Sequence, residues 1–193
     1  MCKSDTSYTP VDEFYTDAVA TLQRLDNMLP PGSTVVSLAL FNGELLYDTM
    51  HALQHPLGSS YANVYDYLAC LGVSPCYGWL NSNAEIRRQT TEHANRLNDE
   101  YRKIAAQSST LFKNINYLFY SADYNKIFAD YGKGGLQIAN LVEKVDGFHP
   151  SQAGNAAMAM DFYGWLEREH PEALGPVNPY NAQLDEQFFA AGK

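Results

Sequence analysis

The chain has 193 residues, with 46% hydrophobic and 13% aromatic residues, which is typical of one folded globular domain and not of a disordered chain. Its 22 acidic residues against 13 basic ones give a net charge of −9 without any Lys/Arg cluster, which argues against nucleic-acid binding. No run of about 18 apolar residues exists, so no transmembrane segment is expected, and residues 1–5 do not have the pattern of a signal peptide.

Helical and strand patterns alternate along the chain. The expected elements, in chain order, are a helix over residues 11–29, a strand over 33–41, helices over 61–71 and 83–106, a strand over 115–121, a loop over 132–135 and a helix over 151–169. Both strands are continuous apolar runs, which is typical of parallel strands buried on both faces. This alternation predicts an α/β layered fold with a parallel sheet.

Two strands are few for a complete sheet, so the chain is interpreted as part of a domain. We expect that part to cover residues 1–175 and to be followed by an irregular tail over residues 176–193, which is rich in Asn and aromatic residues. Functional residues of parallel sheets gather beyond the carboxyl ends of strands, and Asp48, His51 and Asp123 occupy such positions.

The motif Asp146-Gly147-Phe148-His149-Pro150 precedes the last predicted helix and suits acid–base chemistry. An Asp three residues before a His can hold one imidazole nitrogen and leave the other free to take a proton from a nucleophile. Gly147 permits a sharp turn, and Pro150 suits the first position of a helix. The same D-x-x-H spacing recurs at Asp48 and His51, so spacing alone leaves two candidate pairs.

The motif D-x-x-H-P before a final helix resembles the last conserved block of the SGNH (GDSL-type) hydrolases. Longer segments, running nearly from end to end, resemble the acyloxyacyl hydrolases of that superfamily. These segments are Leu29-Pro30, Gly32-Ser33-x-Val35-Val36, His55-Pro56-Leu57-Gly58, Cys70-Leu71-x-Val73-Ser74-Pro75-Cys76-x-Gly78-Trp79, Val145-Asp146-Gly147-Phe148-His149-Pro150 and Asn178-Pro179-x-Asn181.

This resemblance implies a three-layer α/β/α SGNH (flavodoxin-like) fold, present here only as its C-terminal half. It implies an esterase that releases ester-linked fatty acyl chains from lipopolysaccharide lipid A or related lipids, secreted or lysosomal, and paired with a saposin-like lipid-binding subunit. His149 would be the base and Asp146 its orienting carboxylate, while Asp48 and His51 would line the pocket. The chemistry requires no cofactor; whether calcium binds elsewhere in the full protein stays open.

The chain departs from the family pattern in one respect that matters for activity. It contains no Gly-Asp-Ser block for the nucleophile and no Gly-x-Asn-Asp block for the oxyanion hole, and Asn98-Asp99 lies in a polar helix without a preceding Gly. The isolated chain is therefore expected to be inactive. The alternative is a non-catalytic lipid-binding or scaffold protein derived from the second half of the fold.

The three cysteines are interpreted in the light of the resemblance to a secreted enzyme. We expect Cys2 to pair with Cys76, which leaves Cys70 for a disulfide with the saposin-like subunit. A Cys70–Cys76 bridge is the competing arrangement. Among the remaining histidines, His93 and His170 are expected to be solvated.

Overall fold

The computed structural model describes residues 8–188, which fall into two compact units divided after Asp161. The elements of the first unit are α1 (Val11–Met28), β1 (Thr34–Leu38), α2 (Gly43–Met50), α3 (Tyr61–Cys70), α4 (Ala84–Ala106), α5 (Ser108–Leu111), β2 (Asn116–Tyr120), α6 (Tyr124–Lys133), the 3₁₀ helix η2 (Ile138–Leu141) and the first part of α7 (Gln152–Glu169). The remainder of α7, the 3₁₀ helix η3 (Pro171–Ala173) and α8 (Asn181–Phe188) belong to the second unit.

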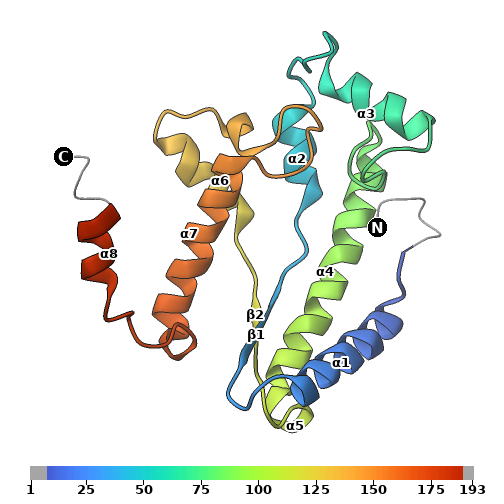
Figure 1. Cartoon of the computed structure of the whole chain (residues 1–193). Helices are drawn as coiled ribbons and strands as arrows, with labels where there is room; N and C mark the ends of the chain where they lie inside the picture. Colours follow the sequence, from blue (N-terminus) through green and yellow to red (C-terminus); the bar gives the residue numbers. More distant parts are fainter. Residues whose placement is uncertain (1–7, 189–193) are drawn as a thin grey trace. The chain divides into compact units, whose positions relative to one another are not determined.

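The two strands lie side by side in a parallel sheet, with Thr34 opposite Asn116 and Leu38 opposite Tyr120 (Figure 1). The α/β class and the parallel sheet predicted from the sequence are thus confirmed. Parallel neighbours need a long crossover connection, and here the segment between the strands forms α2 to α5. Helices α1 and α4 pack against each other, and α4 also contacts β2.

The helices α2, α6 and α8, like the single-turn helix α5, were not expected from the sequence. Helix α2 begins directly after Asn42, whose side chain accepts a hydrogen bond from the Glu44 amide, and α6 begins after Asp123, whose carboxylate accepts one from the Lys126 amide. Both residues are therefore N-caps, which explains why a helix forms where turn residues suggested a loop. Helix α8 lies in the segment expected to be irregular.

A buried carboxylate connects α1 to the beginning of β2. Both oxygens of Asp26 lie 3.1 Å from the Lys113 amide, and one also accepts hydrogen bonds from the amides of Asn114 and Ile115, at 2.7 and 2.9 Å. Although burial favours the neutral acid, these backbone donors hold the pKa of Asp26 below its ordinary value. Asp26 thus satisfies amides that have no strand partner at this end of the sheet.

Strand β1 is shorter than predicted, and just beyond its end the backbone hydrogen-bonds to a side chain instead of to another strand. Asn98 on α4 accepts a hydrogen bond from the Leu40 amide at 2.8 Å and donates one to the Leu40 carbonyl at 3.3 Å. The strand predicted over 33–41 therefore ends at Leu38, and the following residues run toward α2.

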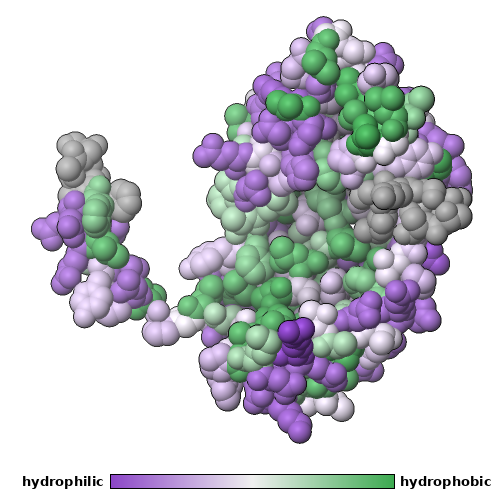
Figure 2. Space-filling model, turned by 45° about the vertical axis from the view of Figure 1, so that its right-hand side comes forward, coloured by the Kyte–Doolittle hydropathy of each residue, from purple (hydrophilic) through white to green (hydrophobic). Residues whose placement is uncertain are grey.

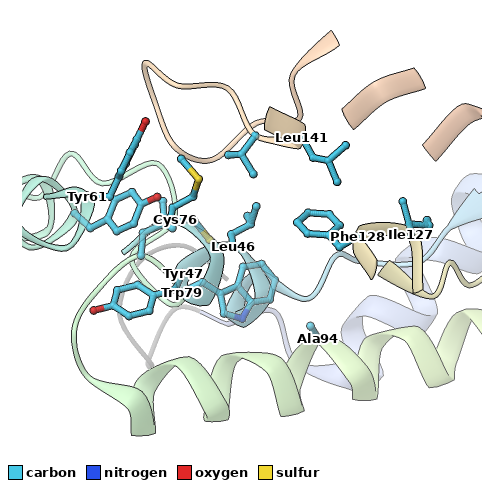
Figure 3. Packing of buried hydrophobic residues seen from close by; sticks show 13 residues of the cluster. Leu46, Tyr47, Tyr61, Cys76, Trp79, Ala94, Ile127, Phe128 and Leu141 are labelled. Atoms are coloured by element: carbon cyan, nitrogen blue, oxygen red, sulfur yellow. The ribbon is translucent and has the colours of Figure 1, made fainter. Parts of the chain in front are cut away.

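The main apolar cluster joins α2, α3, α4, α6 and η2, and Figure 3 shows Leu46, Phe128 and Leu141 directed toward one another within it. Its packing also fixes the start of α2. A Cβ atom on Gly43 would lie 2.2 Å from the indole of Trp79, so only glycine fits at that position. A second cluster, around Leu22, Ile104 and Tyr117, lies under α1 and α4.

In the second unit, aromatic side chains pack against one another. The rings of Phe162 and Trp165 stack at 5.8 Å, and His170 contacts the Trp165 ring edge-on at 4.7 Å. His170 is accordingly half-buried rather than solvated. Within residues 8–188, no helix has both the length and the apolar character needed to cross a bilayer.

Candidate active site

Asp146 and His149 form a hydrogen-bonded pair in the loop before α7. Asp146 Oδ2 lies 2.7 Å from His149 Nδ1, and because a carboxylate can only accept, the proton must reside on Nδ1. Asp146 Oδ1 accepts hydrogen bonds from the amides of Phe148 at 2.8 Å and His149 at 3.0 Å. The His149 side chain is 65% exposed, and among the described residues nothing hydrogen-bonds its Nε2. This is the tautomer and orientation that a general base requires.

The charge on Asp146 is stabilised by the same contacts. Partial burial alone would raise the pKa of Asp146, but the hydrogen bonds from the His149 imidazole and from two backbone amides hold the pKa below its ordinary value. The carboxylate therefore stays ionised at neutral pH and can stabilise an imidazolium that forms on His149.

The loop that carries this pair is closed by its own backbone. The Glu143 amide donates to the His149 carbonyl and the Gly147 amide donates to the Glu143 carbonyl, both at 2.8 Å. Gly147 has a φ of 62°, in the left-handed region where glycine is favoured, as the sequence suggested. A Cβ on Gly147 would also lie 2.5 Å from the Tyr65 hydroxyl, so glycine is needed for space as well.

The transition from this loop into α7 differs from the sequence-based expectation. Pro150 was expected at the first helical position, but α7 begins at Gln152. Ser151 provides the cap instead, because its Oγ accepts a hydrogen bond from the Gly154 amide at 3.1 Å and donates to the Asn140 carbonyl at 2.5 Å. Pro150 pairs with Val142 in an isolated antiparallel bridge.

An apolar cavity of about 330 Å³ adjoins His149. The cavity is surrounded mainly by residues from the end of β1, from α2, α6 and η2, from the dyad loop (residues 143–149) and from the first two turns of α7. The lining residues are Leu38, Ala39, Phe41, Leu46, Trp79, Tyr124, Ile127, Phe128, Leu141, Val142, Phe148, His149, Pro150, Gly154 and Met158. Tyr124 and His149 are the only side chains of this lining that carry an acid–base group. An apolar cavity beside a positioned base suits a hydrocarbon chain attached to a reactive carbonyl.

The second D-x-x-H pair does not form a dyad. Asp48 is exposed on α2, while His51, directly after α2, has its Nδ1 2.9 Å from the Tyr47 carbonyl and its ring stacked on the Tyr47 ring at 5.0 Å. Neither Asp48 nor His51 lines the cavity beside His149, so the interpretation of the two as pocket residues does not hold for this cavity. Of the two candidate pairs, the structure brings together Asp146 and His149.

Three side chains that the sequence analysis did not assign to the site bind the dyad loop. Tyr61 donates to the Lys144 carbonyl and Tyr65 to the Gly147 carbonyl, each at 2.6 Å, and His55 Nε2 lies 2.8 Å from the Val145 carbonyl. The i, i+4 spacing of the two tyrosines was the available signal, but it is equally typical of an ordinary core face. No group of three or more metal-ligating side chains occurs within residues 8–188.

The described residues test only some of the predictions about the cysteines. The Cys70 thiol, at the end of α3, is exposed and free, so the competing Cys70–Cys76 bridge is not formed. Cys76 is fully buried. Cys2 lies outside the described residues. The pairing of Cys2 with Cys76, and the disulfide from Cys70 to a partner subunit, therefore stay predictions.

The chain is similar to known hydrolases over almost its whole length. No protein-family model matches the chain. Acyloxyacyl hydrolase of Homo sapiens is 37% identical over 189 residues, that of Oryctolagus cuniculus 36% over 189 residues, and that of Mus musculus 34% over 197 residues. These matches cover 95%, 95% and 98% of this chain. The chain is a homologue of the acyloxyacyl hydrolases.

The acyloxyacyl hydrolases that match are much longer than this chain. The chain spans 32% of the human and rabbit proteins and 34% of the mouse protein, about a third in each case. The similarity therefore concerns one part of these hydrolases, and in this chain that part carries the Asp146–His149 dyad and its apolar cavity.

Proposed function

We propose that this chain is the base-bearing part of a Ser-His-Asp carboxylic ester hydrolase of the acyloxyacyl hydrolase kind. The substrates would be lipids with ester-linked fatty acyl chains, such as lipopolysaccharide lipid A. The observation that carries this proposal is the position of the Asp146–His149 dyad at an apolar cavity of about 330 Å³. The chain's homology to acyloxyacyl hydrolases supports it.

In the proposed mechanism, His149 Nε2 takes the proton of a serine hydroxyl as that hydroxyl attacks the acyl carbonyl. Asp146 keeps the proton of the imidazole on Nδ1 and stabilises the imidazolium. His149 then returns the proton to the leaving alcohol. The serine and the donors that stabilise the oxyanion would come from a segment outside this chain, because its sequence contains neither a Gly-Asp-Ser nor a Gly-x-Asn-Asp block.

Secretion or delivery to lysosomes, and association with a saposin-like subunit through Cys70, belong to the same proposal. The exposed, free thiol of Cys70 is compatible with such a link. Like the choice of lipid, these features rest on the family resemblance.

A second candidate is a non-catalytic lipid-binding protein. One observation favours it: the lining of the cavity includes no serine, threonine or cysteine, so the described residues place no nucleophile beside His149. Such a protein would bind a fatty acyl chain in the cavity and release it unchanged.

Complementation of a full-length relative distinguishes the two candidates. Residues 1–193 would replace the matching third of human acyloxyacyl hydrolase, and release of fatty acid from lipopolysaccharide would be measured. We expect the hybrid to be active and the 193-residue chain alone to show no esterase activity above background. In the hybrid, His149→Ala should reduce kcat by roughly 10³–10⁶-fold, as the loss of a triad base does.

The matched control is His51→Gln, which changes the histidine of the other D-x-x-H pair and should leave kcat within about threefold, since His51 lies outside the cavity. If His149→Ala retains the activity of the unaltered hybrid, the base assignment is wrong. If the hybrid folds and binds lipid but does not hydrolyse it, the lipid-binding candidate is favoured.

A further inference from the structure

The loop that carries the dyad, residues 143–149, is attached to the rest of the unit by side chains of a distant segment. The attachment joins residues 80 to 90 positions apart in the sequence: Tyr61 to Lys144, Tyr65 to Gly147 and His55 to Val145. Each of the three donors binds a backbone carbonyl of the loop. Carbonyls bound in this way fix the backbone itself, independently of the side chains that the loop carries.

The three donors are themselves rigid. Tyr61 is 2% exposed, Tyr65 1% and His55 5%. The Leu57 amide donates to His55 Nδ1 at 3.1 Å, so the imidazole proton lies on Nε2 and points at the Val145 carbonyl. The rings of His55 and Tyr61 pack edge-on at 4.9 Å, and Tyr61 and Tyr65 pack at 5.9 Å. Burial and mutual packing leave these side chains little rotamer freedom.

Tyr65 has the most direct relation to the dyad. It binds the carbonyl of Gly147, the residue between Asp146 and Phe148, whose positive φ bends the chain so that the Asp146 carboxylate faces His149. The hydroxyl also occupies the space that a Gly147 Cβ would need. Burial raises the pKa of the Tyr65 phenol above its ordinary value, so the group remains a hydrogen-bond donor throughout the physiological range.

We infer that Tyr65, assisted by Tyr61 and His55, is a positioning residue: its bond to the loop backbone holds Asp146 in the geometry that keeps the His149 proton on Nδ1. This inference rests on the proposed function, since it gives the dyad its required tautomer. None of the three residues lines the cavity beside His149, so they act through the loop and not on the substrate.

The tautomer of His149 provides a direct test in the 193-residue chain. Free imidazole side chains prefer the Nε2–H tautomer, whereas a carboxylate held against Nδ1 selects Nδ1–H. In a chain whose histidines are labelled with ¹⁵N, the chemical shifts of the two ring nitrogens distinguish the tautomers when the imidazole is neutral. We expect the wild-type chain to have His149 as Nδ1–H, and Tyr65→Phe to lose this preference while the rest of the amide spectrum is retained.

Tyr67→Phe is the matched control, because it removes a hydroxyl from the same helix at a side chain that is 64% exposed. It should leave the His149 tautomer unchanged. If Tyr65→Phe does not fold, Tyr61→Phe tests the same attachment through the Lys144 carbonyl. A folded Tyr65→Phe or Tyr61→Phe chain in which His149 remains fully Nδ1–H overturns the positioning role.

A failure of the proposed function would give a different NMR result from a failure of the positioning role alone. Asp146→Asn should abolish the Nδ1–H preference if the dyad exists as described, because the neutral amide no longer selects it. A wild-type chain with His149 as Nε2–H, unaffected by Asp146→Asn, would contradict the dyad and with it the proposed function. A wild-type Nδ1–H tautomer that depends on Asp146 but not on Tyr65 would leave the function intact and remove only the positioning role.

Discussion

Asp146 uses both of its carboxylate oxygens, and the two have different tasks. Oδ2 accepts the hydrogen bond from His149, while Oδ1 accepts two bonds from the amides of Phe148 and His149. The amide bonds fix the carboxylate relative to the backbone, so that its contact with the imidazole does not depend on side-chain rotation alone. A dyad that is organised in advance of the reaction loses little free energy to reorganisation.

His93 is a residue for which the sequence-based expectation was wrong. It lies on α4, is only 6% exposed and stacks on the Tyr8 ring at 4.8 Å. Its Nε2 lies 3.0 Å from the Thr9 carbonyl, and Arg96 lies 3.3 Å from its Nδ1. Burial lowers the pKa of His93 below its ordinary value; the contact with Thr9 opposes this shift, and the charge of Arg96 adds to it.

This shift predicts how stability depends on pH. Because the pKa is lower in the folded state, the unfolded chain takes up the proton first as the pH falls through 6.5, the ordinary value. The contribution of His93 to the free energy of unfolding is therefore fully present above about pH 7 and decreases between that pH and the folded pKa. In urea titrations from pH 7.5 to 5, His93→Gln should show a weaker decrease than the wild-type chain.

The control is His170→Gln, which removes a histidine of the second unit and shows whether the loss of any histidine has the same effect. If His93→Gln and the wild-type chain lose stability in parallel over this range, the acid sensitivity does not come from His93.

At the scale of elements, the start of α7 sets the position of the dyad loop. Ser151 binds the Asn140 carbonyl, and the first turn of the helix approaches η2 closely at Gly154. A Cβ on Gly154 would lie 2.1 Å from the Leu141 carbonyl oxygen, a backbone atom that cannot move away cheaply. Helix α7 and η2 are therefore packed backbone to backbone at this point.

The two glycines of α7 should consequently respond in opposite directions to the same substitution. Gly154→Ala should lower the free energy of unfolding by about 1–3 kcal/mol, as overpacking does. Gly164→Ala should raise it by up to about 1 kcal/mol, because alanine is the better helix former. A Cβ on Gly164 would meet only the flexible end of Arg168, at 3.1 Å. Urea unfolding at pH 7 measures both changes.

Equal effects of Gly154→Ala and Gly164→Ala would contradict the close approach of α7 to Leu141. A Gly154→Ala chain that is as stable as the wild type would show that η2 can shift to accept the methyl group.

At the scale of the molecule, the sheet has open edges. Within residues 8–188 it consists of β1 and β2 alone, although parallel strands normally lie in larger, buried sheets. Leu38 of β1 is 58% exposed. Figure 2 shows hydrophobic residues, in green, gathered across the middle of one face of the first unit. Exposed strand edges with apolar surroundings are sites of strand addition from another chain.

We therefore expect the isolated chain to be monomeric when dilute and to self-associate as its concentration rises. Light scattering during size-exclusion chromatography would measure this. Val36→Lys places a charge on β1, which should disfavour edge-to-edge pairing and shift association to higher concentration. The control Lys126→Ala changes a charge on α6 instead of on a strand and should associate like the wild type.

A chain that stays monomeric at all concentrations would indicate that the edges of the two-stranded sheet are already protected. Unchanged association of Val36→Lys would place the contact on another surface.

Much of this protein follows from local sequence patterns. The apolar runs that become β1 and β2 and the periodicity that becomes α1, α4 and α7 depend on residues close in the sequence. The Asp146–His149 pair belongs to the same category, because its partners are three residues apart and Gly147 can be recognised as a turn residue. The helices α2 and α6 were not predicted because their N-caps are Asn42 and Asp123, and Asn and Asp are equally common in turns.

Tertiary structure decided which D-x-x-H pair is a dyad and what lies beside it. Asp48 and His51 have the same spacing as Asp146 and His149, but α2 places them on its surface and at its end, where His51 lies against a backbone carbonyl. The cavity beside His149 and the bonds from Tyr61 and Tyr65 to the dyad loop join segments up to about 120 residues apart. Such contacts depend on the packing of several elements at once, for which no local periodicity or spacing provides a signal.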